Sequence, residues 1–307
     1  MQRILVIGAG AMGCLFAARI AESGADVMLI DVDTARLAAI AREGITLTDD
    51  NGTRSVPMKT GTANEATGPF DLALLFTKGL HSSSATRSLA HLAVAGGPYM
   101  LTLQNGLGNP EIIAETFPQD RILKGIAALP ADLHDATHVS SHGSGHLELG
   151  GMTPAGAQAA EQAAVLLARS GFDARTNAMI DVAIWEKVAF NAALNALGTV
   201  TLQTNAGVNN GPGRRIAAAM VAEVAATAHA CGVPVDAVRI NASIDFALTH
   251  HGGHQASMLQ DRIAGRATEI ESINGAVCER AAAKGVPTPV TSTMTDLVRL
   301  IELNPSR

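Results

Sequence analysis

The chain has 307 residues, of which 47% are hydrophobic and 16% charged, and it carries a net charge of −6 with one Trp and one Tyr. This composition suits a globular protein with large cores, and it disfavours binding to nucleic acids or anionic membranes, which needs a basic surface or stacking aromatics. The three cysteines, Cys14, Cys231 and Cys278, are far apart and form no CxxC pair, which is typical of a reducing, cytoplasmic compartment. The chain opens on a predicted strand, so we expect no secretory leader, and the apolar run 216–231 is too short to span a bilayer.

The first predicted strand, residues 3–7, leads directly into a GxGxxG sequence and then into a predicted helix over 14–22. Gly8 permits a tight turn, Gly10 lets the backbone approach a pyrophosphate, and Gly13 lets the helix pack close to the strand. The unpaired N–H groups at the start of the helix are available to phosphate oxygens. The segment is therefore predicted to bind a dinucleotide, with a ligand-free glycine turn as the alternative.

A second predicted strand, residues 26–30, ends at Asp31, eighteen residues after Gly13. This is near the spacing at which a carboxylate meets the ribose diol of NAD. A carboxylate at this place repels the 2′-phosphate of NADP, so we expect NAD to be preferred. Arg36 lies one helical turn further on and keeps NADP open as the alternative.

Further strand-like runs over 72–76 and 100–103 alternate with helical stretches, which predicts a doubly wound parallel α/β sheet. Thr77-Lys78 and Gln104-Asn105-Gly106 follow two of these strands, and we expect both loops to face the cofactor because ligands bind at the carboxyl ends of such strands. Residues 125–151 are predicted to close the sheet with extended strands and loops. From about Ile180 helical patterns dominate, so we place a domain boundary near Asn177.

One predicted helix of the second half carries Lys187, Asn191 and Asn195 at four-residue intervals, so they form a single polar stripe. Most of its other positions are apolar, which predicts a buried helix whose polar stripe faces a cleft; an exposed polar face is the alternative. Ser257, Asp261, Gly265 and Glu269 show the same spacing and are predicted to share one face of another helix.

These landmarks resemble the ketopantoate reductase family over essentially the whole chain. The matching segments are GAGAMG at 8–13, Lys78, the 104–106 loop, Trp185-x-Lys187 with the asparagines that follow, Asn205, residues 257–261, Glu269 with Ile273-Asn274-Gly275, and Gly285-Val286-Pro287. The resemblance implies an N-terminal Rossmann domain over residues 1–177 and an all-helical substrate-binding domain over 178–307. It also implies reduction of the C2 carbonyl of a 2-keto acid, most directly of 2-dehydropantoate to pantoate.

The resemblance assigns Lys187 as the group that polarises and protonates the keto oxygen, and Glu269 as the residue that positions it. Asn105 and Ser257 are similar to the ligands of the substrate carboxylate. The remaining substrate oxygens would meet three asparagines, Asn191, Asn195 and Asn205. A buried ammonium suits this role because hydride addition builds negative charge on the carbonyl oxygen. The resemblance places the cofactor against Gly8, Gly10, Ala11, Met12, Gly13, Asp31, Lys78 and Asn105.

Two departures from the family leave alternatives open. Family members use NADPH and commonly carry a basic residue where this chain has Asp31. After Asn195 the family usually shows Pro-Leu-Thr, whereas this chain has residues 196–198 as Ala-Leu-Gly. An NAD-dependent D-2-hydroxyacid dehydrogenase and a nucleotide-binding module without turnover are therefore the alternatives, and a homodimer is left open as the assembly.

Histidines occur every four residues from His134 to His146, and a second group comprises His250, His251 and His254. Four-residue spacing brings metal ligands together only on a helix, and the Ser- and Gly-rich segment 139–145 is not predicted to be helical. We therefore expect loop or surface histidines and no metal site.

Overall fold

The structure is a computed structural model in which residues 1–303 can be described. The chain divides into two compact units: unit 1 comprises residues 1–104 and 109–180, and unit 2 comprises residues 105–108 and those from 181 onward. The short loop 105–108 thus belongs with the helices of the second half, although the chain on both sides of it belongs to unit 1.

Unit 1 contains an eight-stranded sheet. Its strands are β1 (Arg3–Ile7), β2 (Asp26–Ile30), β5 (Lys59–Gly61), β6 (Leu72–Leu75), β7 (Tyr99–Thr102), β8 (Ile122–Ala128), β11 (His146–Gly151) and β12 (Asp173–Thr176). They lie in the order β12-β11-β8-β7-β6-β1-β2-β5, with β8 to β5 mutually parallel and β11 antiparallel to β8. Because β2 lies on one side of β1 and β6 on the other, the strand order reverses at the carboxyl ends of β1 and β6.

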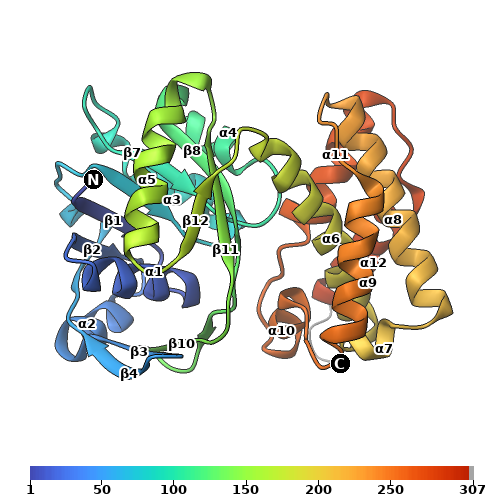
Figure 1. Cartoon of the computed structure of the whole chain (residues 1–307), viewed down its shortest axis with the longest axis horizontal. Helices are drawn as coiled ribbons and strands as arrows, with labels where there is room; N and C mark the ends of the chain where they lie inside the picture. The colour runs from blue at the N-terminus through green and yellow to red at the C-terminus, as the bar shows by residue number, and fades with distance from the viewer. Residues whose placement is uncertain (304–307) are drawn as a thin grey trace. The chain divides into compact units, whose positions relative to one another are not determined.

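Helices cover both faces of this sheet, as expected for mainly parallel strands. Helices α1 (Ala11–Glu22) and α5 (Ala157–Arg169) lie on one face (Figure 1), where Phe16 stacks on Phe172 with ring centroids 4.3 Å apart. The opposite face contributes Leu5 and Leu75 to a second core with Ile113 of α4 (Asn109–Ala114) and residues around α3 (Ser82–Ser88). Helix α2 (Thr34–Glu43) packs beside β5.

A four-stranded second sheet in the order β4-β3-β10-β9 was missed by the sequence analysis. It comprises β3 (Ile45–Asp49), β4 (Gly52–Val56), β9 (Asp132–Leu133) and β10 (His138–Ser141). The prediction that residues 125–151 close the large sheet is therefore wrong in part, because β8 and β11 join that sheet whereas β9 and β10 pair with each other and with β3. In β3, Ile45 and Leu47 are buried and alternate with threonines, which is the period of a half-buried strand.

All regular structure described in unit 2 is helical. The helices are α6 (Ile180–Thr201), α7 (Asn205–Val208), α8 (Gly211–Ala230), α9 (Ala237–His250), α10 (Ser257–Ile263), the π-helix η6 (Glu271–Gly275), α11 (Ala276–Lys284) and α12 (Pro289–Leu303). Helix α8 packs against α9, α11 and α12 (Figure 1). A doubly wound sheet followed by helices confirms the predicted fold class. No helix within residues 1–303 is long and apolar enough to cross a membrane.

Candidate functional site

The three glycines of the GxGxxG segment have different surroundings. Gly8 has a φ of +102°, and a Cβ there would lie 3.0 Å from the backbone nitrogen of Thr77. A Cβ at Gly13 would lie 1.7 Å from the carbonyl oxygen of Gly8, so the helix approaches the strand at a distance that only glycine allows. At Gly10, by contrast, a Cβ would meet nothing within 4 Å outside its own chain neighbours among residues 1–303. The open side of the turn therefore lies at Gly10.

The start of α1 is suited to bind phosphate. The first N–H groups of a helix, here those of Ala11 and Met12, have no carbonyl partner within the helix. In the described part of the chain the cap residue Gly10 supplies no side-chain hydrogen bond to them, and the first turn holds no acidic residue. With the helix dipole and the open space at Gly10, this end of α1 fits the pyrophosphate of a dinucleotide.

Asp31 lies directly beside this turn. Its Oδ2 accepts a hydrogen bond from the backbone N–H of Ala9 at 2.5 Å, and its Oδ1 accepts one from Asp33 at 2.9 Å. Arg36 donates from Nη1 to the carbonyl oxygen of Ala9 at 3.0 Å, and its Nε is buried without a hydrogen-bond partner among the described residues. Asp31 and Arg36 thus both form hydrogen bonds with Ala9 of the glycine turn.

The loops after β6 and β7 are joined within unit 1. Gln104 donates from Nε2 to the carbonyl oxygen of Thr77 at 2.5 Å and to Ser82 Oγ at 2.8 Å. Thr77 itself packs against Gly8, and Lys78, which follows it, is half-buried. These loops therefore lie at the carboxyl ends of β1, β6 and β7, next to the glycine turn. Gly8, Thr77 and Gln104 meet where the strand order reverses.

A lysine, a carboxylate and an amide come together in unit 2. Lys187 lies on α6, and its burial lowers the pKa of its ammonium from 10.5 to about 8, while the charge of Glu269 acts in the opposite direction. Glu269 Oε2 accepts a hydrogen bond from Asn105 Nδ2 at 3.0 Å. Because its pKa lies just above neutrality, this ammonium is mainly protonated at pH 7 and can still give up its proton, which suits a general acid.

The polar stripe on α6 continues beyond Lys187 as the sequence predicts. Asn191 is half-buried, and Asn195 is only 4% exposed. The Nδ2 of Asn195 has no hydrogen-bond partner among residues 1–303, so this buried donor is available to a ligand. Asn205 is also buried, and its Nδ2 donates to the carbonyl oxygen of Ala247 at 3.4 Å. Ser257 is exposed at the first position of α10.

The prediction that Ser257, Asp261, Gly265 and Glu269 share one helix face is wrong. Helix α10 ends at Ile263, and Gly265 adopts a φ of +63°, which breaks the helix before Glu269. Asp261 instead forms an ion pair with Arg266, with Oδ1 and Nε 2.9 Å apart, and Glu269 lies in the segment leading into η6. The four-residue spacing was therefore coincidental, because a glycine near a helix end stops the helix more often than it continues one.

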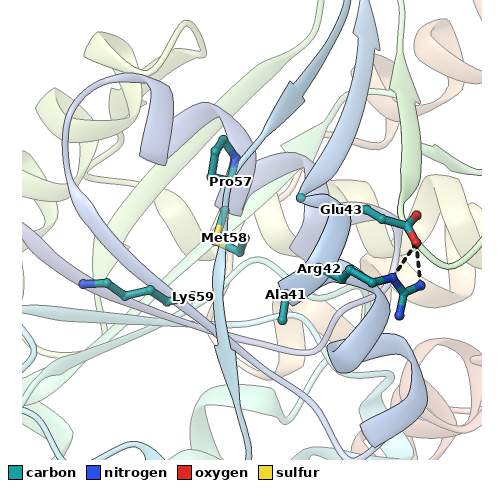
Figure 2. Close-up of a pocket in the computed structure, with 7 residues that line it drawn as sticks. Ala41, Arg42, Glu43, Pro57, Met58 and Lys59 are labelled. Carbon is teal, nitrogen blue, oxygen red and sulfur yellow. Dashed lines mark hydrogen bonds and ion pairs between the residues drawn. The ribbon is translucent and has the colours of Figure 1, made fainter.

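A pocket of about 430 Å³ lies elsewhere in unit 1 (Figure 2). It is lined by the end of α2, including Arg42 and Glu43, and by Pro57, Met58 and Lys59. Arg42 and Glu43 pair with each other in Figure 2. Lys59 opens β5, so the pocket lies at the amino ends of the parallel strands, whereas ligands of such sheets bind at the carboxyl ends. The glycine turn is the better candidate.

The histidine groups are distributed over β strands, loops and the C-terminal end of α9, where His250 lies. His134 and His138 contact each other with ring centroids 4.7 Å apart, and His138 Nε2 lies 2.9 Å from Thr48 Oγ1. His142 lies beside Asp50. Within residues 1–303, no three His, Cys, Asp or Glu side chains are grouped as metal ligands would be.

Two family models match this chain in succession: Ketopantoate reductase PanE/ApbA over residues 4–154, and its C-terminal counterpart over residues 179–302. A 2-dehydropantoate 2-reductase of Halobacterium salinarum is 30% identical, covering 98% of this chain and 99% of its own. The enzyme of the same name from Streptococcus pyogenes is 29% identical over 97% of each chain.

Solved structures align over nearly the full length. D-mandelate dehydrogenase in a ternary structure with NADH and anilino(oxo)acetate gives a TM-score of 0.94 at 28% identity, with all of both chains covered. The 2-dehydropantoate 2-reductase of Geobacter metallireducens gives 0.90 at 30% identity, covering 97% of this chain and 99% of its own.

Proposed function

Because the chain belongs to the ketopantoate reductase family, we propose that it transfers a hydride between a nicotinamide cofactor and the C2 carbonyl of a 2-keto acid, with 2-dehydropantoate reduced to pantoate. The observation that carries this proposal is Lys187, whose pKa is lowered by burial to about 8 beside the carboxylate of Glu269. Binding alone needs no acid, so this pair favours catalysis over a nucleotide-binding module without turnover.

When bound, a reduced nicotinamide supplies the hydride for the carbonyl carbon. Lys187 stabilises the negative charge that develops on the keto oxygen and donates the proton that completes the alcohol. Glu269 keeps the ammonium form populated by raising its pKa against the effect of burial. Asn105 donates to Glu269 and so limits where that carboxylate can point.

The other polar groups of unit 2 fit the substrate's oxygens. Asn195 offers a buried N–H₂ donor that no described residue uses, and a buried donor of this kind is costly unless a ligand or water completes it. By resemblance, Asn105 and Ser257 would bind the substrate carboxylate, and Asn191 and Asn205 the remaining oxygens. A negatively charged, oxygen-rich keto acid is the class of substrate that such donors select.

For the cofactor, we propose NAD over NADP. Gly8, Gly10 and Gly13, the start of α1 and Lys78 would hold the dinucleotide, and Asp31 would accept from the ribose hydroxyls. Asp31 Oδ2 and Oδ1 each accept one backbone N–H, which fixes the carboxylate beside the turn and leaves lone pairs on both oxygens. Arg36 already donates to Ala9, which weakens it as a competing ligand for a 2′-phosphate.

A second candidate function is that of an NAD-dependent D-2-hydroxyacid dehydrogenase. The segment that follows Asn195 favours it, because Gly198 on α6 stands where the family usually has a threonine and so presents no hydroxyl to a substrate. A Cβ at Gly198 would lie 3.2 Å from the carbonyl oxygen of Gln203 and 3.7 Å from Ala256 Cβ, so this part of α6 is closely packed. D-mandelate dehydrogenase, with a phenyl-bearing substrate by name, is also among the similar structures.

Steady-state kinetics with both cofactors tests these proposals. We expect kcat/KM with NADH to exceed that with NADPH by about tenfold or more, and this preference to shrink or reverse in Asp31→Ala, because a charge opposing a phosphate at contact distance costs at least about 1 kcal/mol. Asp50→Ala, which removes an exposed acid that pairs with His142 away from the glycine turn, is the matched control and should keep the preference. A clear NADPH preference in the unmodified protein would refute the argument from Asp31.

The same assay ranks the substrates. We expect 2-dehydropantoate to be reduced more efficiently than the keto acid of mandelate; the reverse order would replace the first candidate function by the second.

We further propose that residues 1–177 form the dinucleotide-binding domain and 178–307 the substrate-binding domain, and that the enzyme works in the cytoplasm, where its three free cysteines stay reduced.

A further inference from the structure

The segment that follows Glu269 has an unusual backbone. Residues 271–275 form a π-helix, in which Gly275 N–H donates to the carbonyl oxygen of Ile270 at 2.9 Å, five residues earlier. The carbonyl oxygen of Glu269 accepts from the backbone N–H of Ile273 at 3.1 Å and from Ser272 Oγ at 3.2 Å. Single π turns are rare and occur frequently at functional sites, because the extra residue displaces neighbouring side chains from the regular helical positions.

This π-helix is attached to the helix that carries Lys187. Asn274 has no exposed surface, and its Nδ2 donates to the carbonyl oxygen of Ala192 on α6 at 3.1 Å. Ala192 is five residues beyond Lys187 and directly follows Asn191. The Oδ1 of Asn274 is buried and has no partner within residues 1–303. Burying an asparagine among apolar side chains costs free energy, and the bond from Nδ2 to Ala192 is the contact that offsets part of this cost.

The same π-helix also holds the loop that contains Asn105. Leu107 N–H donates to the carbonyl oxygen of Ser272 at 2.8 Å. Gly106 has a φ of +90°, and a Cβ there would lie 2.1 Å from that same oxygen, so the loop contacts η6 as closely as a backbone can. Asn105, one residue earlier, donates to Glu269. One turn of backbone thus contacts α6 through Asn274 and the loop through Ser272.

We propose that Asn274 is a positioning residue for catalysis: by tying the π-helix η6 to the carbonyl oxygen of Ala192, it sets the place of Glu269 relative to Lys187. This inference rests on the proposed function of Lys187 and Glu269. Asn274 itself touches no reacting atom. Its loss would let η6 move away from α6, and Glu269 would move with it because Glu269 leads directly into η6.

The charged groups around Lys187 determine how a movement of Glu269 would change the pKa of this lysine. Among the described residues, the charge of Glu269 raises the pKa of Lys187. Glu186, beside Lys187 on α6, pairs with Arg239, and Glu271 on η6 pairs with Arg299. A displaced Glu269 would therefore leave burial to dominate, and the pKa of Lys187 would fall.

The test compares Asn274→Leu with a matched control, Asn209→Leu. Asn209, which follows α7, makes the same kind of bond: its Nδ2 donates to the carbonyl oxygen of Leu248 at 3.1 Å. Leu248 lies on α9, so this bond does not involve α6 or η6. For Asn274→Leu we expect kcat to fall about 10- to 100-fold with a smaller change in KM, as for a catalytic group displaced by about an ångström. The alkaline limb of kcat should move to lower pH by about half a unit or more. If Asn274→Leu does not fold, Asn274→Ala gives the same comparison without added bulk.

A second readout does not depend on turnover: the pH dependence of acylation of Lys187, followed by mass spectrometry, reports its pKa directly. We expect the midpoint to be lower in Asn274→Leu and unchanged in Asn209→Leu, although both variants lose some thermal stability. An unchanged midpoint and pH limb in Asn274→Leu would overturn the positioning role. If the unmodified protein reduced no 2-keto acid while the midpoint still moved, the proposed function would fail and the positioning of Glu269 would stand.

Discussion

Replacing Lys187 by methionine should make the protein more stable at neutral pH. The pKa of this lysine is about 8 in the folded protein and 10.5 in a freely hydrated side chain. Since one pKa unit corresponds to about 1.4 kcal/mol, the folded protein holds the ammonium form at a cost of about 3 kcal/mol. Methionine has similar length and no charge, so Lys187→Met should recover up to about that amount, less what partial solvent exposure already screens.

The gain should depend on pH in a defined way. The folded pKa lies below the unfolded one, so the unfolded chain binds more protons between pH 8 and 10.5, and the unmodified protein becomes more stable across that window. The advantage of Lys187→Met should therefore be constant below about pH 8 and shrink to nearly nothing above 10.5. Trp185, the single tryptophan, is buried two residues before Lys187 on α6, and its fluorescence during urea unfolding at several pH values measures this.

Lys284→Met is the control, since Lys284 is exposed at the end of α11. It should change stability by well under 1 kcal/mol at any pH, in the direction of a small loss because a cation at a helix C-terminus is favourable. If Lys187→Met were no more stable than the unmodified protein at pH 7, or if its advantage persisted at pH 11, the argument that Lys187 is a desolvated ammonium would be refuted.

The remaining predictions concern the carboxylate and the glycine turn. Glu269→Gln should shift the alkaline limb of the reduction rate below about pH 8, because the neutral amide no longer raises the pKa of Lys187, whereas Glu271→Gln should leave it in place; identical limbs in both variants would contradict the coupling of Glu269 to Lys187. Gly10→Val should weaken NADH binding, measured by fluorescence titration, by about 100-fold or more while the unfolding midpoint stays close to normal, because the added side chain enters open space that a pyrophosphate needs. Gly253→Val, at another open glycine, is its control, and normal NADH affinity in Gly10→Val would contradict the dinucleotide assignment.

Four strands of the large sheet, β1, β2, β6 and β7, could be predicted because their signals are local, whereas the short edge strands β5 and β12 were not predicted. A β-branched run followed by a glycine turn fixes β1 and α1 within a few residues, and the apolar runs at β6 and β7 are continuous because both faces of a parallel sheet are buried. The small sheet was missed for the opposite reason. Its strands β3 and β10 pair with each other although about ninety residues separate them in the sequence. Nothing local in these threonine- and serine-rich strands indicates which strand each one pairs with.

The candidate site divides in the same way. Lys187, Asn191 and Asn195 could be placed together from the sequence because they share one long helix. Glu269 could be named through the family resemblance, but its spacing from Ser257 gave a wrong helix, since Gly265 ends α10. The bond from Asn274 to Ala192 could not be predicted, because it joins residues 82 positions apart and an isolated asparagine in an apolar segment has many other uses.

Consumption of NADH by the unmodified protein and by Lys187→Met, in the presence of 2-dehydropantoate at pH 7, tests the central claim most directly. We expect turnover in the unmodified protein and a loss of about 10³-fold or more in the variant, with NADH affinity nearly unchanged, because the lysine serves the keto oxygen alone. Equal turnover in the two proteins would contradict the role assigned to Lys187, and absence of turnover with every 2-keto acid in the unmodified protein would contradict the proposed reaction.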